Sequence, residues 1–271
     1  MNIQTDPRRL RSAAKPCPPA AEEPIRAHFL HDDRLRELGA RLARGDVPDV
    51  ASIGAFDFQA RVRENGERIL EVYRATNAAQ ARGDMVTPAA QWLLDNHYLV
   101  EETSFQIKRD LPRRFYRQLP TMEVAGLQPV PRALAIAWVY VAHTDSTVSL
   151  SSFKAIVEGF QSVVPLKIGE LWALPSLLRF VLIENLRRIA VRVNRSRELR
   201  QSANEVADQV LGSGDGVDEA SLLADYTTHA CDTSFATQLL YRLRDGSQNS
   251  EMALDWLEKV LEQAGTDAEE T

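Results

Sequence analysis

A short segment rich in arginine and aromatic residues is the part of this sequence best suited to bind a ligand. The segment LPRRFYRQLP (111–120) carries Arg113, Tyr116 and Arg117 close together. A guanidinium group pairs with carboxylates and phosphates through two parallel hydrogen bonds, and it stacks on aromatic faces. The segment therefore predicts recognition of a sugar, a phosphate or a carboxylate. It equally fits a loop that is anchored onto helices carrying acidic residues.

A second group of polar residues lies within or beside strongly apolar stretches. Such residues usually serve as helix caps or pair with the backbone, so a structural role is the simpler interpretation. The alternative is a polar network that orients loops or contacts a partner. The candidates for either role, in addition to the three above, are Asp95, Asn96, Glu101, Glu102, Asp145, Glu170, Trp172, Glu184, Asn185 and Arg188.

Glu184 and Arg188 form the most specific pair in this group. They lie four positions apart in a helical pattern, in the order that favours attraction between an acid and a base. The preceding residues 177–183 are apolar on nearly every side except at Arg179, which indicates a stretch that is buried all round. We therefore expect the pair to be desolvated rather than exposed.

The sequence contains no recognisable catalytic motif. The glycine-rich stretch 212–216 lacks the Gly-Lys-Ser/Thr ending of a phosphate loop and follows a helical pattern rather than a strand. His28 and His31 lie near carboxylates, but no third metal ligand is implied. We predict no catalytic residue, no metal site and no cofactor for this chain by itself.

Composition and charge narrow the choice of partner. The chain has 271 residues, of which 44% are hydrophobic and 26% charged, as in an ordinary globular protein. Its net charge of −6 argues against nucleic acid as a partner. Between Arg187 and Arg200, however, six arginines stand against one acid. This run is either a solvated helix face or a surface for anionic lipid headgroups or phosphate.

Hydrophobic residues recur at helical spacing, and no alternating pattern typical of strands appears, which predicts an all-α fold. The apolar run 133–142 is too short to span a membrane and predicts a buried core helix. Pro175 is expected to begin one long helix, about 175–211, after a short helix at 168–173. Several prolines make 112–131 a predicted loop.

These patterns predict three parts of the chain. Residues 1–24 are rich in proline and arginine and predict a disordered tail. Residues 25–211 are expected to form a helical N-terminal module. After the flexible stretch 212–216, residues 217–265 predict a shorter helical segment.

Four blocks of sequence resemble the N-terminal region of the bacterial cyclic β-1,2-glucan synthases. The order and spacing of the blocks match that family, and the resemblance extends over about residues 60–265. The blocks are TPAAQWLLDNHYLVEE (87–102), KRDLPRRFYRQLP (108–120), AHTDS (142–146) and PLKIGELWALPSLLRFVLIENLRR (165–188).

The resemblance implies a very long inner-membrane enzyme, of which this chain is an N-terminal fragment or a truncated reading frame. It also implies that residues 217–265 lead toward a transferase domain that lies outside this sequence. Such synthases use UDP-glucose to build a β-1,2-glucan, first on the protein itself, and then cyclise it. UDP-glucose and a divalent metal are implied only for the membrane-embedded transferase domain. For this chain the resemblance implies a cytoplasmic place at the inner face of the inner membrane. The implied partners are the transferase and membrane domains.

Three functions remain open from the sequence. The first is an interaction module of a cyclic β-1,2-glucan synthase that is not catalytic alone. The second is an independent carbohydrate- or nucleotide-sugar-binding module that uses the loop from Arg113 to Arg117 together with Trp172. The third is an unrelated helical regulator.

Overall fold

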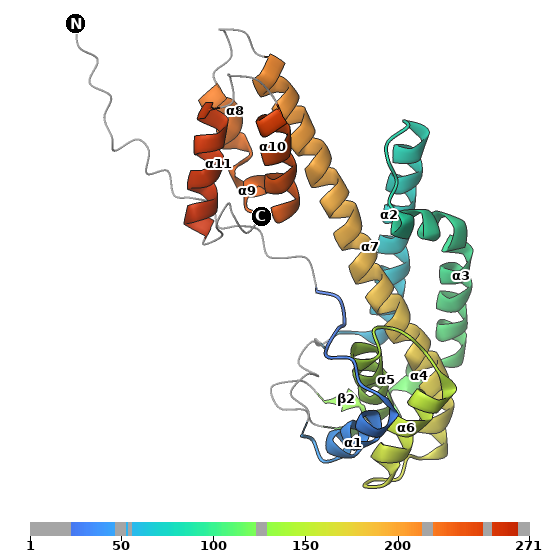
Figure 1. Cartoon of the computed structure of the whole chain (residues 1–271). Helices are drawn as coiled ribbons and strands as arrows, with labels where there is room; N and C mark the ends of the chain where they lie inside the picture. The colour runs from blue at the N-terminus through green and yellow to red at the C-terminus, as the bar shows by residue number, and fades with distance from the viewer. Residues whose placement is uncertain are drawn as a thin grey trace, which may run out of the picture. The chain divides into compact units, whose positions relative to one another are not determined.

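A computed structural model of the chain describes residues 23–46, 53, 56–122, 129–212, 219–245 and 251–264. Helices dominate this part of the chain, which confirms the all-α fold (Figure 1). The helices are α1 (Asp32–Ala43), α2 (Phe58–Ala81), α3 (Pro88–Asp110), α4 (Arg113–Tyr116), α5 (Arg132–His143), α6 (Leu150–Gln161), α7 (Ile168–Gly212), α8 (Glu219–Asp225), α9 (Thr227–Ala230), α10 (Thr233–Asp245) and α11 (Glu251–Ala264). Two short strands, β1 (Thr121–Met122) and β2 (Val130–Pro131), pair antiparallel.

The described residues form two compact units, each with its own hydrophobic core. We call residues 23–194 the N-terminal unit and residues 195–264 the C-terminal unit. The division falls between Asn194 and Arg195, inside α7. The sequence predicts a boundary at the glycine-rich stretch 212–216, because glycines end helices. Residues 213–216 of that stretch lie outside the described residues.

Helix α5 is the centre of the N-terminal unit. Every side chain from Ala133 to His143 is buried, as the apolar run predicted. Helices α1 and α6 and the first turns of α7 lie around it (Figure 1). Within the described residues, no helix combines the length and the apolar character needed to cross a membrane.

Helices α1 and α6 pack backbone against backbone through two glycines. A Cβ atom added to Gly39 would lie 2.2 Å from the carbonyl oxygen of Ile156. One added to Gly159 would lie 2.0 Å from the carbonyl oxygen of Arg36. No side chain larger than hydrogen fits at either position, so these glycines set the distance between the two helices.

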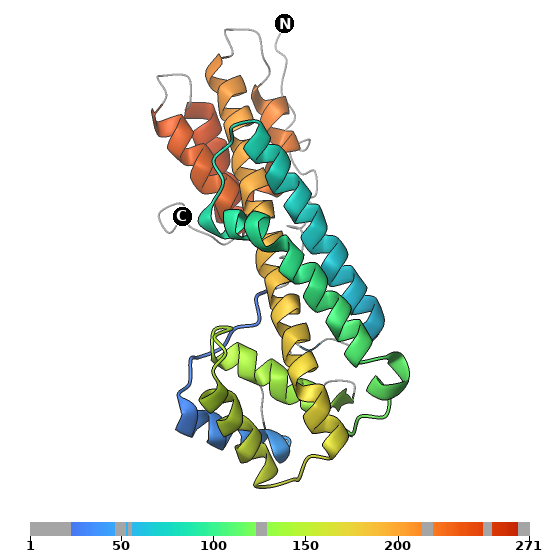
Figure 2. The same ribbon diagram turned by 90° about the vertical axis from the view of Figure 1, so that its right-hand side faces the viewer.

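Helices α2 and α3 pack against each other as an antiparallel hairpin (Figure 2). Asp57 caps the first turn of α2 and Thr87 that of α3, each by accepting a hydrogen bond from a backbone N–H. The rings of Phe58 and Phe180, 4.7 Å apart, join α2 to α7. The buried positions of α2 alternate in steps of three and four, which is the spacing that keeps one stripe in contact with neighbouring helices: Phe58, Val62, Asn65, Ile69, Val72, Thr76 and Ala79.

The expected long helix is confirmed as α7, but two local details were wrong. The helix begins at Ile168 rather than at Pro175, because the expected short helix at 168–173 continues into it with Pro175 inside. Its start is set at Lys167, where the Glu170 side chain accepts a hydrogen bond from the backbone N–H at 2.9 Å. Ala173 and Leu174, just before the proline, are buried, and this packing offsets the backbone hydrogen bond that Pro175 cannot donate. The predicted loop 112–131 contains α4, β1 and β2 in its described part.

The C-terminal unit is built around the last part of α7. Its core joins that helix to α10 and α11, and Ser196 and Ser234 share a hydrogen bond of 2.7 Å across the α7–α10 contact. The fully buried core side chains include Val206, Phe235 and Leu239. This unit therefore has the helical character that the sequence predicted for 217–265.

Candidate functional site

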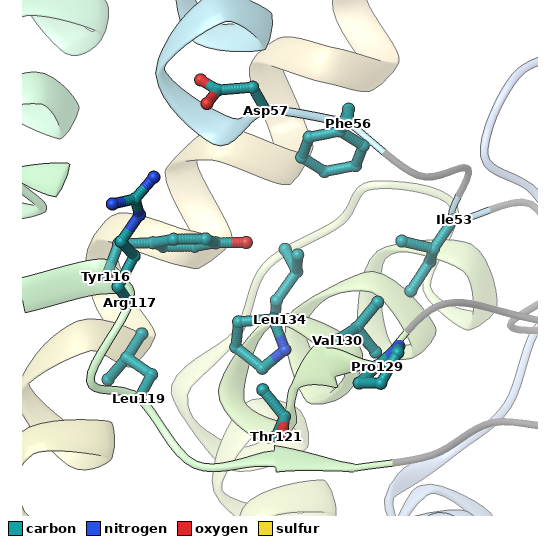
Figure 3. A pocket seen from close by; sticks show the side chains of 11 residues that line it. Ile53, Phe56, Asp57, Tyr116, Arg117, Leu119, Thr121, Pro129, Val130 and Leu134 are labelled. Carbon is teal, nitrogen blue, oxygen red and sulfur yellow. The ribbon is translucent and has the colours of Figure 1, made fainter.

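A pocket of about 590 Å³ lies in the N-terminal unit beside the start of α2. This volume is within the usual range for small-molecule sites. Figure 3 shows that its walls come from the residues before α2, from the end of α4 and from the two short strands. The wall is mixed in polarity, and its members are Ile53, Phe56, Asp57, Tyr116, Arg117, Leu119, Thr121, Pro129, Val130, Pro131 and Leu134.

Tyr116 presents a hydroxyl group to this pocket. Its ring stacks on Phe58, with centroids 4.2 Å apart and planes 15° apart, and Figure 3 shows the hydroxyl pointing into the hollow. Burial and, to a smaller extent, the charge of Asp57 raise the pKa of the Tyr116 hydroxyl well above its ordinary value. The hydroxyl therefore stays protonated and can donate a hydrogen bond to a ligand.

Asp57 and two arginines form the charged edge of the pocket. The Asp57 side chain accepts a hydrogen bond from the backbone N–H of Ala60 at 3.0 Å and pairs with Arg113 at 3.3 Å. That hydrogen bond, followed by the charges of Arg113 and Arg117, keeps the pKa of Asp57 below its ordinary value. Asp57 is therefore a charged acceptor at neutral pH, while Arg117 is an exposed donor beside it.

The pocket brings together part of the predicted arginine and aromatic site. Tyr116 and Arg117 line it, and Arg113 lies at its edge through Asp57. Sequence reasoning missed Asp57, although an Asp placed before a helical pattern is a recognisable capping signal. It also missed Thr121, for which the sequence holds no local signal.

Glu184 is the centre of a buried ionic cluster in α7. Its side chain is 1% exposed, and one of its oxygens, Oε1, accepts hydrogen bonds from Arg187 Nη2 at 2.8 Å and Arg188 Nε at 2.9 Å. The other oxygen, Oε2, lies 3.9 Å from Arg61 Nε on α2. Arg188 also lies over the ring of Trp138, 5.2 Å from its centroid. The expectation that Glu184 and Arg188 are desolvated is confirmed.

Asn185 and Arg188 hold an extended segment of the chain, residues 23–30, which we call the strap. Asn185 Oδ1 accepts from the backbone N–H of Ile25 at 2.7 Å, and Asn185 Nδ2 donates to the Ile25 carbonyl at 3.4 Å. Arg188 donates to the Glu23 carbonyl at 3.0 Å. The last two residues of the predicted tail, 23 and 24, therefore belong to the folded unit. Residues 1–22 of that tail lie outside the described residues.

Asp145 and Glu170 also have partners within the N-terminal unit. Asp145 lies in the turn after α5 with a positive φ of 49° and forms an ion pair of 3.3 Å with Arg26 of the strap. Glu170 is fully buried and accepts two hydrogen bonds from Arg132, at 2.9 and 2.5 Å. A two-pronged pair of this kind fixes the start of α5 against the start of α7.

The remaining candidates lie on helix surfaces and do not meet the pocket. Trp172 is 79% exposed on α7. The four candidates on α3 interact within that helix: Asp95 with Gln91, Asn96 with the Trp92 carbonyl, Glu101 with His97, and Glu102 with Gln106. Among the described residues, no group of three or more His, Cys, Asp or Glu side chains is placed to hold a metal ion.

Comparison with known proteins gives one strong match. Over 246 residues, or 91% of this chain, the sequence is 55% identical to the cyclic β-(1,2)-glucan synthase NdvB of Rhizobium meliloti (strain 1021). The chain resembles the N-terminal region of that cyclic β-(1,2)-glucan synthase. The matched segment is only 9% of the synthase's length, and no family model matches the chain. Because 246 of the 271 residues are matched, the match extends over most of both units and includes the pocket and the ionic cluster.

Proposed function

We propose that this chain is a helical accessory module of a cyclic β-1,2-glucan synthase and that it has no catalytic activity on its own. The observation that carries the proposal is the 55% identity across 91% of the chain. The placement of the polar candidates supports it. Glu170, Glu184 and Asn185 are buried in contacts that join helices to one another or to the strap, a role that stabilises a fold.

In this proposal the module lies at the cytoplasmic face of the inner membrane and contacts the transferase and membrane domains of the synthase. UDP-glucose and a divalent metal belong to the transferase domain. The arginines between Arg187 and Arg200 are a proposed contact with anionic lipid. Arg187 and Arg188 are buried and pair with Glu184, and Arg195 lies 3.7 Å from Asp232, so only part of the run is available to lipid. We expect this contact to be weak, and we expect no nucleic-acid binding.

The test uses labelled UDP-glucose and three samples. The purified chain alone should incorporate no glucose into glucan or into protein. A synthase produced without the matching 246-residue segment should lose activity, and addition of the separate chain should restore part of it. Heat-sensitive incorporation by the chain alone would overturn the non-catalytic role. Full activity of the truncated synthase would overturn the accessory role.

The pocket favours a second candidate function, the binding of a saccharide. Tyr116 directs a donor into the hollow, and Asp57 and Arg117 provide an acceptor and a cation at its rim (Figure 3), while the other walls are largely apolar. Calorimetry with β-1,2-glucan oligosaccharides and with UDP-glucose tests it. Arg117→Ala should abolish any binding, whereas the exposed neighbour Arg114, which does not line the pocket, can be replaced as the control.

A further inference from the structure

The outer face of α3 exposes four large apolar side chains. The exposed fractions are 48% for Trp92, 62% for Tyr98, 40% for Leu99 and 66% for Phe105. Trp92 and Leu99 are seven positions apart, as are Tyr98 and Phe105, so they form two rows along the helix. At about 1.5 Å per residue each row extends over roughly 10 Å, and the four residues together span roughly 20 Å.

This face is distinct from the one that holds α3 in the fold. The opposite stripe, with Leu93, Val100 and Ile107, is buried, and α2 is the main neighbour of α3. Single exposed apolar residues are common, but three aromatic side chains gathered on one side of a helix are typical of a surface that binds another protein. Within the described part of the N-terminal unit, no element covers these three rings.

The charges on this face point to the kind of partner. Asp95, Glu101 and Glu102 are exposed on α3 among the aromatic residues, and their hydrogen bonds or ion pairs stay within the helix. The basic residues Lys108 and Arg109 lie in the last turn, beyond the two rows. An acidic aromatic face repels anionic lipid and attracts a polypeptide that carries lysine or arginine.

We propose that this α3 face, defined by Trp92, Tyr98, Leu99 and Phe105 with the three acids, docks a basic amphipathic helix from the rest of the synthase. At 100° per residue Asp95 and Glu102 lie between the Trp92/Leu99 pair and the Tyr98/Phe105 pair, so apolar anchors flank two carboxylates that a basic amphipathic helix can contact. The matched segment is 9% of the relative's length, so most of that protein lies outside it and is available as the occupant. The inference rests on the proposed accessory function and specifies its interface.

The experiment measures binding of the full chain to the R. meliloti synthase produced without its matching segment and solubilised in detergent. Loss of two central aromatic anchors, in Tyr98→Ser/Phe105→Ser, should weaken binding by about thirtyfold or more. The control is Leu150→Ser, an apolar residue on α6 that is 85% exposed and far from α3 in the sequence. It should bind as the wild type does. Circular dichroism should show both variants folded, because the replaced side chains are exposed.

A charge test adds a second measurement. Glu101→Lys/Glu102→Lys should weaken binding at low salt and reduce its salt dependence, because the attraction for a basic partner is lost. If both double variants bind the truncated synthase as tightly as the wild-type chain does, the docking face is overturned and the accessory function stays intact. A wild-type chain that does not bind would overturn both. A dimer in sedimentation that Tyr98→Ser/Phe105→Ser disrupts would overturn the proposed occupant and assign the face to a second copy.

Discussion

Removal of the Glu184 carboxylate should destabilise the N-terminal unit strongly. The side chain is 1% exposed and neutralises Arg187 and Arg188, whose side chains are each 8% exposed. Glu184→Ala deletes both hydrogen bonds and leaves two guanidinium groups with little access to water. Removing one partner of a buried ion pair costs about 3–5 kcal/mol, against about 0.3–0.5 kcal/mol for an exposed helix pair.

The coupling between Glu184 and Arg188 separates their interaction from their other contacts. Arg188→Ala also removes the hydrogen bond to Glu23 and the contact with Trp138, so the single variant alone is ambiguous. In the double-mutant cycle those losses cancel. With one charge-assisted hydrogen bond of 2.9 Å in a desolvated site, we expect a coupling of about 1.5–3 kcal/mol.

Denaturant unfolding followed by tryptophan fluorescence measures these values. Trp138 is 1% exposed and lies beneath Arg188, so it reports on this part of the core. The control is the pair Arg63 and Glu67 on α2, which has the same i,i+4 spacing, a distance of 3.8 Å and side chains that are 66% and 65% exposed. A Glu184–Arg188 coupling below about 0.5 kcal/mol, no larger than the control, would refute the reasoning.

Three further predictions concern packing, the strap and the basic run. Gly159→Ala should lower the free energy of unfolding by about 1–3 kcal/mol, because the new Cβ would meet the Arg36 carbonyl. Gly66→Ala is the control: its Cβ would meet open space, so the free energy of unfolding should rise by about 0.5–1 kcal/mol. Equal effects of the two variants in denaturant unfolding would contradict this. Asn185→Ala leaves the Ile25 backbone N–H without its side-chain acceptor and should speed proteolysis within the strap; an unchanged cleavage rate would show that Asn185 is not its anchor. The chain should sediment weakly with anionic vesicles, in a salt-sensitive manner, and not with neutral ones, and absence of binding even at low salt would identify the basic run as a solvated and internally paired surface.

Local patterns in the sequence were sufficient for the helices and for part of the core. The apolar run from Ala133 to Ala142 forms a buried helix, because a helix that is apolar on all sides has no face to present to water. The burial of Glu184 followed from the same kind of pattern, read from the apolar residues before it. Both depend on residues within a few turns of one another, which the sequence displays directly.

The tertiary structure alone decided which distant residues meet. Arg113 pairs with Asp57, 56 positions away, and Asn185 binds the backbone of Ile25, 160 positions away. The spacing of residues in the sequence does not predict these two pairs, because they depend on how whole helices pack. For the same reason the pocket around Tyr116 and the division of the chain inside α7 were not predictable. Side-chain types and spacing determine each helix, whereas packing among helices determines what their polar residues do.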